Sequence, residues 1–285
     1  MSKSLVNKSS IKVVPVESKK DWNDFFNVRR QVYRDDPNVV FPLRMMEKTQ
    51  LMPGKHPFYE HARRQAFVCY SDNQPVGRVA AVKDDLHNEH YGDRVGFFGF
   101  FETSDNQDFA DALIAAAAAW LKEQGCDTIR GPVSPSMKAE FGVVVEGNDD
   151  PPFVMMGYSP KYYEELLLGS GFEITREFNA YLYDVESQLD GIMESEHQLI
   201  DATRRVLDRY PKLRIGSVNK STIEKELREI NVLANQVRSS GWGFVPLTDA
   251  ELDFMIAQLK RVIVPEMLLV AYWEDRLVGY CINIP

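Results

Sequence analysis

The stretch FVCYSDNQPVG at residues 67–77 occurs a second time, 202 residues later, as LVAYWEDRLVG at residues 269–279. The two copies align without a gap. The matched pairs are Val68/Val270, Tyr70/Tyr272, the acids Asp72/Glu274, Val76/Val278 and Gly77/Gly279. Upstream, the tripeptide FPL at 41–43 matches VPL at 245–247 at a spacing of 204 residues. Several matches in one order, at nearly one offset, predict a tandem duplication of one fold.

Each copy is predicted to contain a β-hairpin. Residues 66–70 and 76–82 are rich in β-branched and aromatic side chains, and the turn residues SDNQ at 71–74 separate them. The second copy repeats the pattern with Glu274-Asp275 at its turn. A short strand-like run and a helical stretch precede each hairpin. We therefore expect one β-α-β-β module at 11–82 and again at 213–284.

The duplication determines the expected domain organisation. We predict a first unit at 1–186, a helical connector at 187–211 and a second unit at 212–285. The second copy stops soon after its hairpin, whereas the first continues well beyond its own. An apolar strand at 268–284 would then lie unpaired at a sheet edge, which is unfavourable. We therefore expect that the second unit is truncated.

After its hairpin, the first unit is predicted to alternate strands and helices. The apolar run RVGFFGFFE at 94–102 predicts a strand, and a capping box of Ser104 and Gln107 opens a helix that stops at Gly125. A strand at 128–131, a helix started by Ser159-Pro160 and ending near Gly169, and a strand at 173–184 follow. A strand, a long crossover helix and a strand imply a parallel pair. The fold class is therefore α/β, as an α+β mixed sheet with helices packed on it.

Composition excludes several classes of protein. The 285 residues are 44% apolar and carry 33 basic against 42 acidic side chains, a net charge of −9. Such a chain is globular, and its net charge indicates no nucleic-acid or membrane partner. The three cysteines are too scattered for a disulfide framework or a zinc site, so we expect no metal. The longest apolar run, at 112–121, is about half of the ~20 residues that span a membrane. A soluble, cytoplasmic protein is expected.

The order of elements resembles the GNAT superfamily of N-acyltransferases, which move an acyl group from acyl-CoA to an amine. The hairpin that closes on PVG at 75–77, the strand 96–102 that leads into a helix at 105–124, and SPKYYEELLLGSGF at 159–172 carry the resemblance. The last is similar to the superfamily's N-x-x-A…Y-x-x-x-G-F element. The likeness covers 11–185, begins again over 213–285, and is strongest to a bacterial tandem-domain branch with GPVSPS, here at 131–136. It implies a GNAT-like fold, with one complete unit followed by a partial second copy. It also implies acetyl-CoA or another acyl-CoA as co-substrate, and a small-molecule amine or peptide as acceptor.

The loop expected to hold the CoA pyrophosphate departs from the superfamily pattern. GNAT enzymes place a Q/R-x-x-G-x-G/A loop at a helix N-terminus, where free N–H groups and the helix dipole favour anions. Here the loop reads TSDNQD at 103–108, and Asp105, Asp108 and Asp111 crowd the helix start. Both an ordinary capped helix and a working phosphate cradle stay open. The pantetheine arm could instead bind like an added strand where Gly96 and Gly99 let two strands splay. The candidate cofactor-binding residues are Phe100, Phe101, Thr103, Ser104, Asn106 and Gln107.

The candidate catalytic residues are acids and tyrosines. The tyrosine that usually acts as general acid in the superfamily maps to Leu167, which cannot protonate a thiolate. Tyr158, Tyr162 and Tyr163 lie nearby, and a phenol with a pKa of ~10 suits that role. The tyrosines are also consistent with simple packing. For deprotonating the amine, Glu102 at the end of its strand is the first candidate and Glu140 the second. Either acid is also consistent with an ordinary surface charge.

Three functions stay open at this point. The first is an acyl-CoA-dependent N-acyltransferase with its site in the first unit. The second is a GNAT-like protein that has lost catalysis and binds a ligand or partner, and the third is a transferase that uses acyl carrier protein. Because duplication already supplies the paired sheets that single-unit relatives obtain by dimerising, we expect a monomer.

Overall fold

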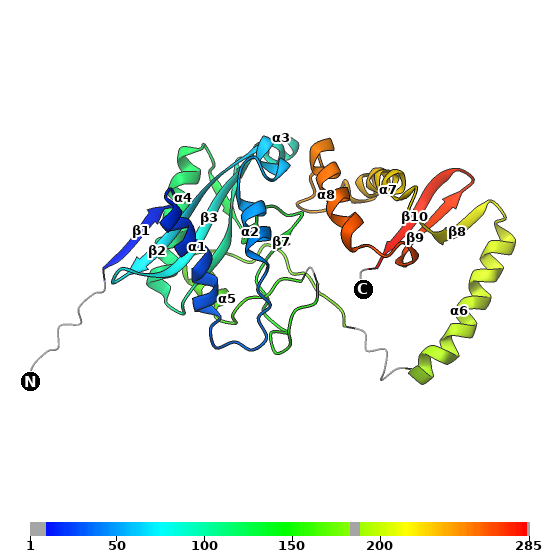
Figure 1. The fold of residues 1–285 in the computed structure, drawn as a ribbon, viewed down its shortest axis with the longest axis horizontal. Coiled ribbons are helices and arrows are strands. Elements are labelled where there is room, and N and C mark those ends of the chain that lie inside the picture. The colour runs from blue at the N-terminus through cyan, green and yellow to red at the C-terminus, as the bar shows by residue number, and fades with distance from the viewer. Residues whose placement is uncertain (1–9, 155, 183–188, 284–285) are drawn as a thin grey trace, which may run out of the picture. The chain divides into compact units, whose positions relative to one another are not determined.

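The computed structural model describes residues 10–154, 156–182 and 189–283 (Figure 1). The chain forms two compact units. The first extends to Glu173 and includes 243–245, and the second comprises 174–242 and the residues from Pro246 onward. Within the described ranges, no helix combines the length and apolar character needed to cross a bilayer.

A five-stranded mixed sheet forms the centre of the first unit. Its strands lie in the order β1-β2-β3-β4-β5, and all neighbours are antiparallel except the parallel pair β4–β5. The strands are β1 (Ile11–Pro15), β2 (Ala62–Ser71), β3 (Gln74–Asp84), β4 (Val95–Thr103) and β5 (Thr128–Arg130). Asp72 and Asn73 join β2 to β3 with positive φ angles of 50° and 64°, which the short polar side chains of these residues tolerate. The predicted hairpin, parallel pair and mixed-sheet fold class are confirmed.

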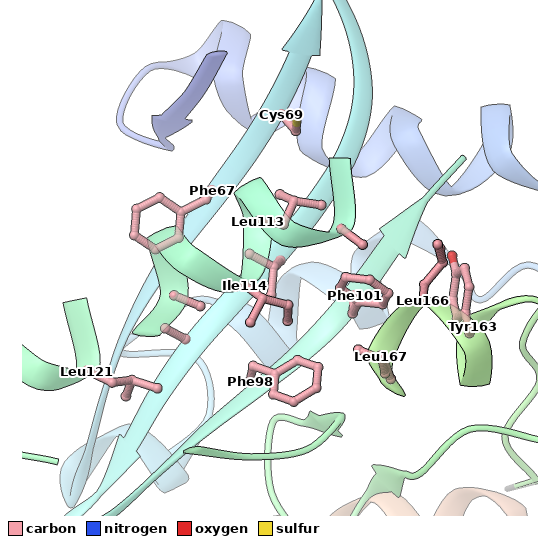
Figure 2. Packing of buried hydrophobic residues seen from close by; sticks show 14 of the residues in the cluster. Phe67, Cys69, Phe98, Phe101, Leu113, Ile114, Leu121, Tyr163, Leu166 and Leu167 are labelled. Atoms are coloured by element: carbon pink, nitrogen blue, oxygen red, sulfur yellow. The ribbon is translucent and has the colours of Figure 1, made fainter. Parts of the chain in front are cut away.

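Helices cover both faces of this sheet. Leu113, Ile114 and Leu121 of α4 pack on Phe67 and Phe98 of the strands, as Figure 2 shows. Aromatic residues of α1 pack with small residues of β2 and β3 in a separate cluster. The helices of the unit are α1 (Lys19–Val32), α2 (Arg44–Leu51), the 3-10 turn η1 (Pro57–Glu60), α3 (Asp85–Tyr91), α4 (Gln107–Glu123) and α5 (Tyr163–Gly169). Because the apolar positions of α4 recur at helical spacing, one face of the helix is buried, as predicted.

The second unit repeats the start of the first. Its described sheet has the order β10-β9-β8. Its elements are α6 (Leu189–Arg209), β8 (Leu213–Ser217), α7 (Ile223–Arg238), α8 (Asp249–Val262), the 3-10 turn η3 (Pro265–Met267), β9 (Leu268–Trp273) and β10 (Arg276–Ile282). Helix α6 occupies most of the segment in which the sequence predicts a connector.

Strand register confirms the duplication. Ile11 pairs with Ser71 in the first unit, and Leu213 pairs with Trp273 in the second, each residue being shifted by 202. The hairpins also share a bulge, because the ladders skip Val76 in one copy and the aligned Val278 in the other. A one-residue slip would turn every side chain of a strand to the opposite face. Identical register therefore means that equivalent residues face equivalent sides of the two sheets.

The predicted start of the helix after β4 is wrong. Asn106 caps α4, and its side-chain oxygen accepts the N–H of Phe109 at 3.3 Å. This bond satisfies one of the free donors at the helix start. The hydroxyl of Ser104 instead donates to the carbonyl oxygen of Val76 at 3.4 Å. Ser104 thus fastens the end of β4 to the hairpin rather than capping the helix.

The next helix also begins later than predicted. Ser159 does not cap it, because α5 starts at Tyr163. The Ser159 hydroxyl accepts the N–H of Val144 at 2.9 Å, and the Ser159 carbonyl accepts the side-chain amide of Asn148 at 2.6 Å. These bonds hold a loop in place. The helix ends at Gly169, as predicted.

The predicted strand at 173–184 is not formed over the residues described. Residues 173–182 are irregular, and 183 and 184 lie outside the described ranges. Phe178, Tyr181 and Leu182 are 62%, 90% and 75% exposed, so the apolar pattern of this segment is not buried. A strand needs an edge to pair with, and β5, an edge strand of the five-stranded sheet, is only three residues long.

Candidate functional site

Strand β4 is unpaired on one side over its second half. Strand β5 pairs with it only from Val95 to Phe97, whereas β4 continues to Thr103. On the other side, the register with β3 shifts beyond Arg78, and Phe100 has a φ of 49° at this bulge. A bulge bends a strand and redirects its side chains. Pairing of β4 with β5 thus ends at Phe97, and the backbone of β4 is distorted just beyond that point.

A short hairpin crosses β4 at this opening. It consists of β6 (Val133–Ser134) and β7 (Glu140–Phe141). A Cβ atom added to Gly99 would lie 1.7 Å from the carbonyl oxygen of Val133, so only glycine permits this crossing. The Ser134 hydroxyl accepts the N–H of Phe100 at 2.8 Å. Since Ser134 pairs with Glu140, the hairpin brings Glu140 to the bulge.

Beside the bulge lies a buried cluster of charges from four elements. Arg78 of β3 is 1% exposed, and its Nη2 lies 3.4 Å from the Oε1 atoms of both Glu47 and Glu102. Arg29 of α1 contributes its Nε, 3.3 Å from the same oxygen of Glu102. Glu47 belongs to α2 and Glu102 to β4. Two guanidinium groups thus neutralise two carboxylates in a site largely shielded from water.

Glu102 is fully engaged within this cluster. Its Oε1 faces both arginines, and its Oε2 accepts the hydroxyl of Tyr163 at 2.8 Å. The sequence places Glu102 beside Phe100 and Phe101 and predicts a base there. Folding surrounds the carboxylate with charged and hydrogen-bonding partners, which favour a positioning role.

Glu140 has a different setting. Its side chain is exposed at the edge of the cluster. Nearby protein removes water from the carboxylate and raises its pKa, and the charges of Glu102 and Glu47 act in the same direction. Arg29 and Arg78 oppose the shift. With two arginines and three acids, the cluster has one carboxylate in excess, and Glu140 is the most exposed of the three acids.

The three candidate tyrosines have separate hydrogen-bond partners. Tyr163 donates to Glu102 and accepts the N–H of Thr103 at 3.0 Å, and burial holds its pKa well above the usual value. Tyr162 donates to the carbonyl oxygen of Thr103 at 2.9 Å, and burial raises its pKa as well. Tyr158 donates to Asp36, and burial followed by that contact raises the pKa of Tyr158 to about 12. Only Tyr162 and Tyr163 therefore meet at the end of β4.

Sequence reasoning missed four members of the site. Arg29, Glu47 and Arg78 belong to the charged cluster, and Tyr33 lies next to it at 2% exposure. The Tyr33 hydroxyl donates to the carbonyl oxygen of Tyr158 at 3.3 Å, and burial followed by Glu102 raises the pKa of Tyr33. Arg78 could have been recognised from the sequence. It lies within the apolar strand VGRVAAV, and an arginine buried in such a strand needs a partner.

The residues predicted to bind the cofactor mostly support the fold. The side chains of Phe100, Phe101 and Thr103 are buried, so only backbone groups of this part of β4 could meet a ligand. Gln107 donates to the carbonyl oxygen of Leu166 at 3.0 Å and thereby ties α4 to α5. Ser104 and Asn106 are occupied as described above.

An open groove of about 390 Å³ lies between α4 and the end of α5. It is lined by Asp111, Ile114, Ala115, Gly169, Ser170 and Gly171. Asp111 places a negative charge in this groove, and no arginine or lysine is among its lining residues. Such a lining does not attract phosphate. Among the residues described, no three His, Cys, Asp or Glu side chains are arranged to hold a metal ion.

The second unit does not repeat the charged cluster at the matching place. The shared register aligns Arg78 with Tyr280, because Arg78 pairs with Val68 and Tyr280 pairs with Val270. Tyr280 is a partly buried apolar contact of the second core. The ion pairs of Arg78 therefore have no equivalent at this position of β10, and the candidate site belongs to the first unit.

Comparison with known proteins gives distant relatives, and no protein-family model matches the chain. Protein YghO of Escherichia coli (strain K12) is 29% identical over 269 residues, which cover 94% of this chain and 66% of YghO. A bacterial ceramide synthase of Caulobacter vibrioides is 28% identical over 279 residues, which cover 97% of this chain and 70% of that protein. The chain thus spans about two thirds of the length of these relatives.

One solved structure that this chain resembles is a tandem GNAT protein from the clavulanic acid biosynthesis pathway. Its TM-score is 0.48 at 11% identity, over 95% of this chain and 73% of that one.

Proposed function

We propose that the first unit is an acyl-CoA-dependent N-acyltransferase that forms an amide on a primary amine. The supporting observation is the opening of β4. There a bulge, an unpaired strand half and the excess carboxylate of Glu140 come together. An extended ligand can add to an open strand edge through backbone hydrogen bonds, and an amine needs a nearby base. The name of the ceramide synthase relative supports amide formation as the reaction class.

Glu140 is proposed as the base. A protonated amine is attracted to the excess negative charge at the edge of the cluster, where Glu140 is exposed. The raised pKa of Glu140 makes it a better proton acceptor than an ordinary carboxylate. Arg78, Arg29 and Glu102 are assigned a positioning role, since they hold β3, α1 and β4 together behind Glu140.

Electrons and protons balance in this scheme. The protonated amine first loses one proton to Glu140, and the neutral nitrogen then forms the C–N bond to the acyl carbon while the C–S bond of the thioester breaks. The nitrogen loses its second proton as the amide forms, and this proton restores the group that protonates the thiolate. The departing thiolate then takes up a proton. Tyr162 is the proposed donor, because its hydroxyl lies at the end of β4 in a partly buried position. Tyr163 is proposed to position Glu102 instead.

The groups that would receive acyl-CoA are backbone atoms rather than side chains. The second half of β4 offers an edge for an extended pantetheine arm, although Ser134 and Tyr163 already occupy the N–H groups of Phe100 and Thr103. The start of α4 carries Asp108 and follows Asp105, with no nearby cation in its first turn. We therefore expect weak retention of the pyrophosphate and binding dominated by the pantetheine and acyl portions.

A second candidate is a binding protein that has lost catalysis. The observation that favours it is the same pair of occupied N–H groups, together with the acidic start of α4. This candidate predicts ligand binding at the opening of β4 without turnover. A transferase that uses acyl carrier protein predicts turnover with the loaded carrier and none with free acyl-CoA.

The test is thermal melting with acetyl-CoA and long-chain acyl-CoA, followed by release of free thiol in the presence of primary amines. A ligand at about 100 times its Kd should stabilise the protein by ~2.7 kcal/mol. Glu140→Gln should then lower kcat by at least about a hundredfold and leave acyl-CoA affinity unchanged. Glu146→Gln, an exposed acid in the following loop, is the matched control.

Each outcome separates the candidates. Stabilisation with amine-dependent thiol release supports the transferase, and stabilisation without release for any amine supports the binding protein. No shift with any acyl-CoA would sink the acyl-CoA proposal. Equal rates for wild type and Glu140→Gln would remove Glu140 as the base.

A further inference from the structure

We propose that one face of the first unit docks on an anionic lipid surface. The face consists of the exposed side chains of Val40, Leu43, Met45 and Met46, here named the α2 face. They are 58%, 67%, 73% and 55% exposed. Apolar side chains gathered in this way on a protein surface mark sites of interaction.

Helix α2 is packed on the first unit with its two methionines, Met45 and Met46, exposed. Its inner residues are Glu47 and Leu51, which are 7% and 0% exposed. Arg44 reaches across to α1, where its Nη1 donates to Asn27 at 3.4 Å and its guanidinium stacks on Phe26. The methionines of the opposite side therefore project from a fixed support, and they have no role in the core.

The chain segment that contains the α2 face is basic, although the whole chain is acidic. Between residues 30 and 55 the sequence has the cations Arg30, Arg34, Arg44, Lys48 and Lys55 against three acids. Two of those acids are occupied, because Glu47 is buried against Arg78 and Asp36 accepts the hydroxyl of Tyr158. The local charge is thus opposite in sign to the net charge of −9.

Apolar side chains flanked by lysine and arginine suit an anionic bilayer. Such a segment lies in the interface, with its apolar side chains among the acyl chains and its cations at the headgroups. The core of a protein interface, by contrast, is depleted in lysine. The net charge of the whole chain predicts no membrane partner. The excess of cations between residues 30 and 55 instead favours an anionic surface.

The test is sedimentation of the full chain with vesicles at about 50 mM and about 500 mM salt. The higher salt concentration screens the electrostatic attraction between the protein and the lipid headgroups. One set contains phosphatidylcholine alone, and the other adds about 30% phosphatidylglycerol as the anionic lipid. We expect binding to the anionic vesicles at low salt, at least about tenfold weaker binding without phosphatidylglycerol, and a loss at high salt. Lys55→Ala should weaken binding about fivefold, since one juxtamembrane cation contributes about that factor.

The double variant Met45→Glu and Met46→Glu should bind at least about tenfold more weakly than wild type. The matched control is Val237→Glu on α7, a position with 71% exposure outside the α2 face, which should bind as wild type does. A second measurement does not depend on the double variant. Met46→Cys in a Cys281→Ser background, labelled with an environment-sensitive dye, should shift to shorter wavelength on anionic vesicles. The other cysteines, Cys69 and Cys126, are buried.

Three results would overturn the proposal. The first is no binding to anionic vesicles at low salt together with an unchanged dye spectrum. The second is equal loss in Val237→Glu. The third is a wild-type oligomer that Met45→Glu and Met46→Glu convert to monomer, which would assign the α2 face to a second copy of the chain. None of these measurements uses acyl transfer, so the outcome is independent of the proposed activity.

Discussion

Replacing Glu102 by glutamine tests whether this carboxylate holds the charged cluster together or accepts the substrate proton. Glutamine keeps the shape but removes the charge that faces Arg29 at 3.3 Å and Arg78 at 3.4 Å. Removing one partner of a buried ion pair costs about 3–5 kcal/mol. Because Arg78 keeps Glu47 at 3.4 Å, we expect a value of about 3 kcal/mol.

This loss should be visible in the melting temperature of the first unit. For a domain of this size, 1 kcal/mol corresponds to about 2–4 °C, so Tm should fall by about 6–12 °C. Urea denaturation followed by tryptophan fluorescence can report both units, since Trp22 and Trp120 belong to the first and Trp242 and Trp273 to the second. The exposed Glu266→Gln is the control, and it should change stability by no more than about 0.5 kcal/mol.

The same variant has an expected effect on activity. Without the charge of Glu102, the pKa of Glu140 should fall, because a repulsive charge is gone and Arg29 is free to attract. The acidic limb of kcat/KM should therefore move to lower pH, with turnover at neutral pH within about tenfold of wild type. A Tm change below about 2 °C would refute the structural role. If turnover falls by more than about a hundredfold while the acidic limb of the pH profile of kcat/KM stays at the same pH, Glu102 is the base.

Three further substitutions test the surroundings of the site. Tyr163→Phe removes the hydroxyl between Glu102 and the N–H of Thr103 and leaves both buried groups without this partner. The free energy of unfolding in urea should fall by about 1–3 kcal/mol. The control Tyr181→Phe, at 90% exposure, should have no effect. Gly99→Ala should lower the urea midpoint by the equivalent of about 1–3 kcal/mol because its methyl group would collide with Val133, while Gly216→Ala, with open space around it, should not destabilise the second unit. Because the pKa of Glu140 is raised in the folded protein, protonation of Glu140 stabilises the folded state. This stabilisation is fully present below pH 4.5, the ordinary pKa of glutamate, and it is lost as the pH rises through the pKa of the folded protein. At pH 7 the urea midpoint of Glu140→Gln should therefore be higher than that of wild type, and near pH 4 the two midpoints should be equal. A higher urea midpoint for wild type at pH 7 would contradict this prediction.

The two copies of the module have diverged at the residue that carries the ion pairs. Equal register places Arg78 and Tyr280 at the same position of their strands. An arginine there needs acids to neutralise it, which the first unit supplies from α2 and β4. Tyr280 joins an apolar cluster and needs no such partner. The candidate site described above lies in the first unit, and the second unit keeps the backbone pattern with a tyrosine in place of Arg78.

The elements that sequence alone determined are those with local physical causes. Alternating apolar residues and turn residues predicted both hairpins, and repetition of the pattern predicted the duplication that the register confirms. The apolar spacing of α4 predicted its buried face. Helix starts were less certain, because Ser104 and Asn106 are both good caps and a tertiary bond to Val76 decides between them.

The tertiary structure decided how the charges of the candidate site are grouped. Arg29, Glu47, Arg78, Glu102 and Glu140 come from α1, α2, β3, β4 and β7, and no local pattern links residues that far apart in the chain. For the same reason, net charge concealed the basic surroundings of the α2 face. Periodicity records which side of an element is buried, whereas pairing of buried charges depends on which elements meet, and that is settled only when the chain has folded.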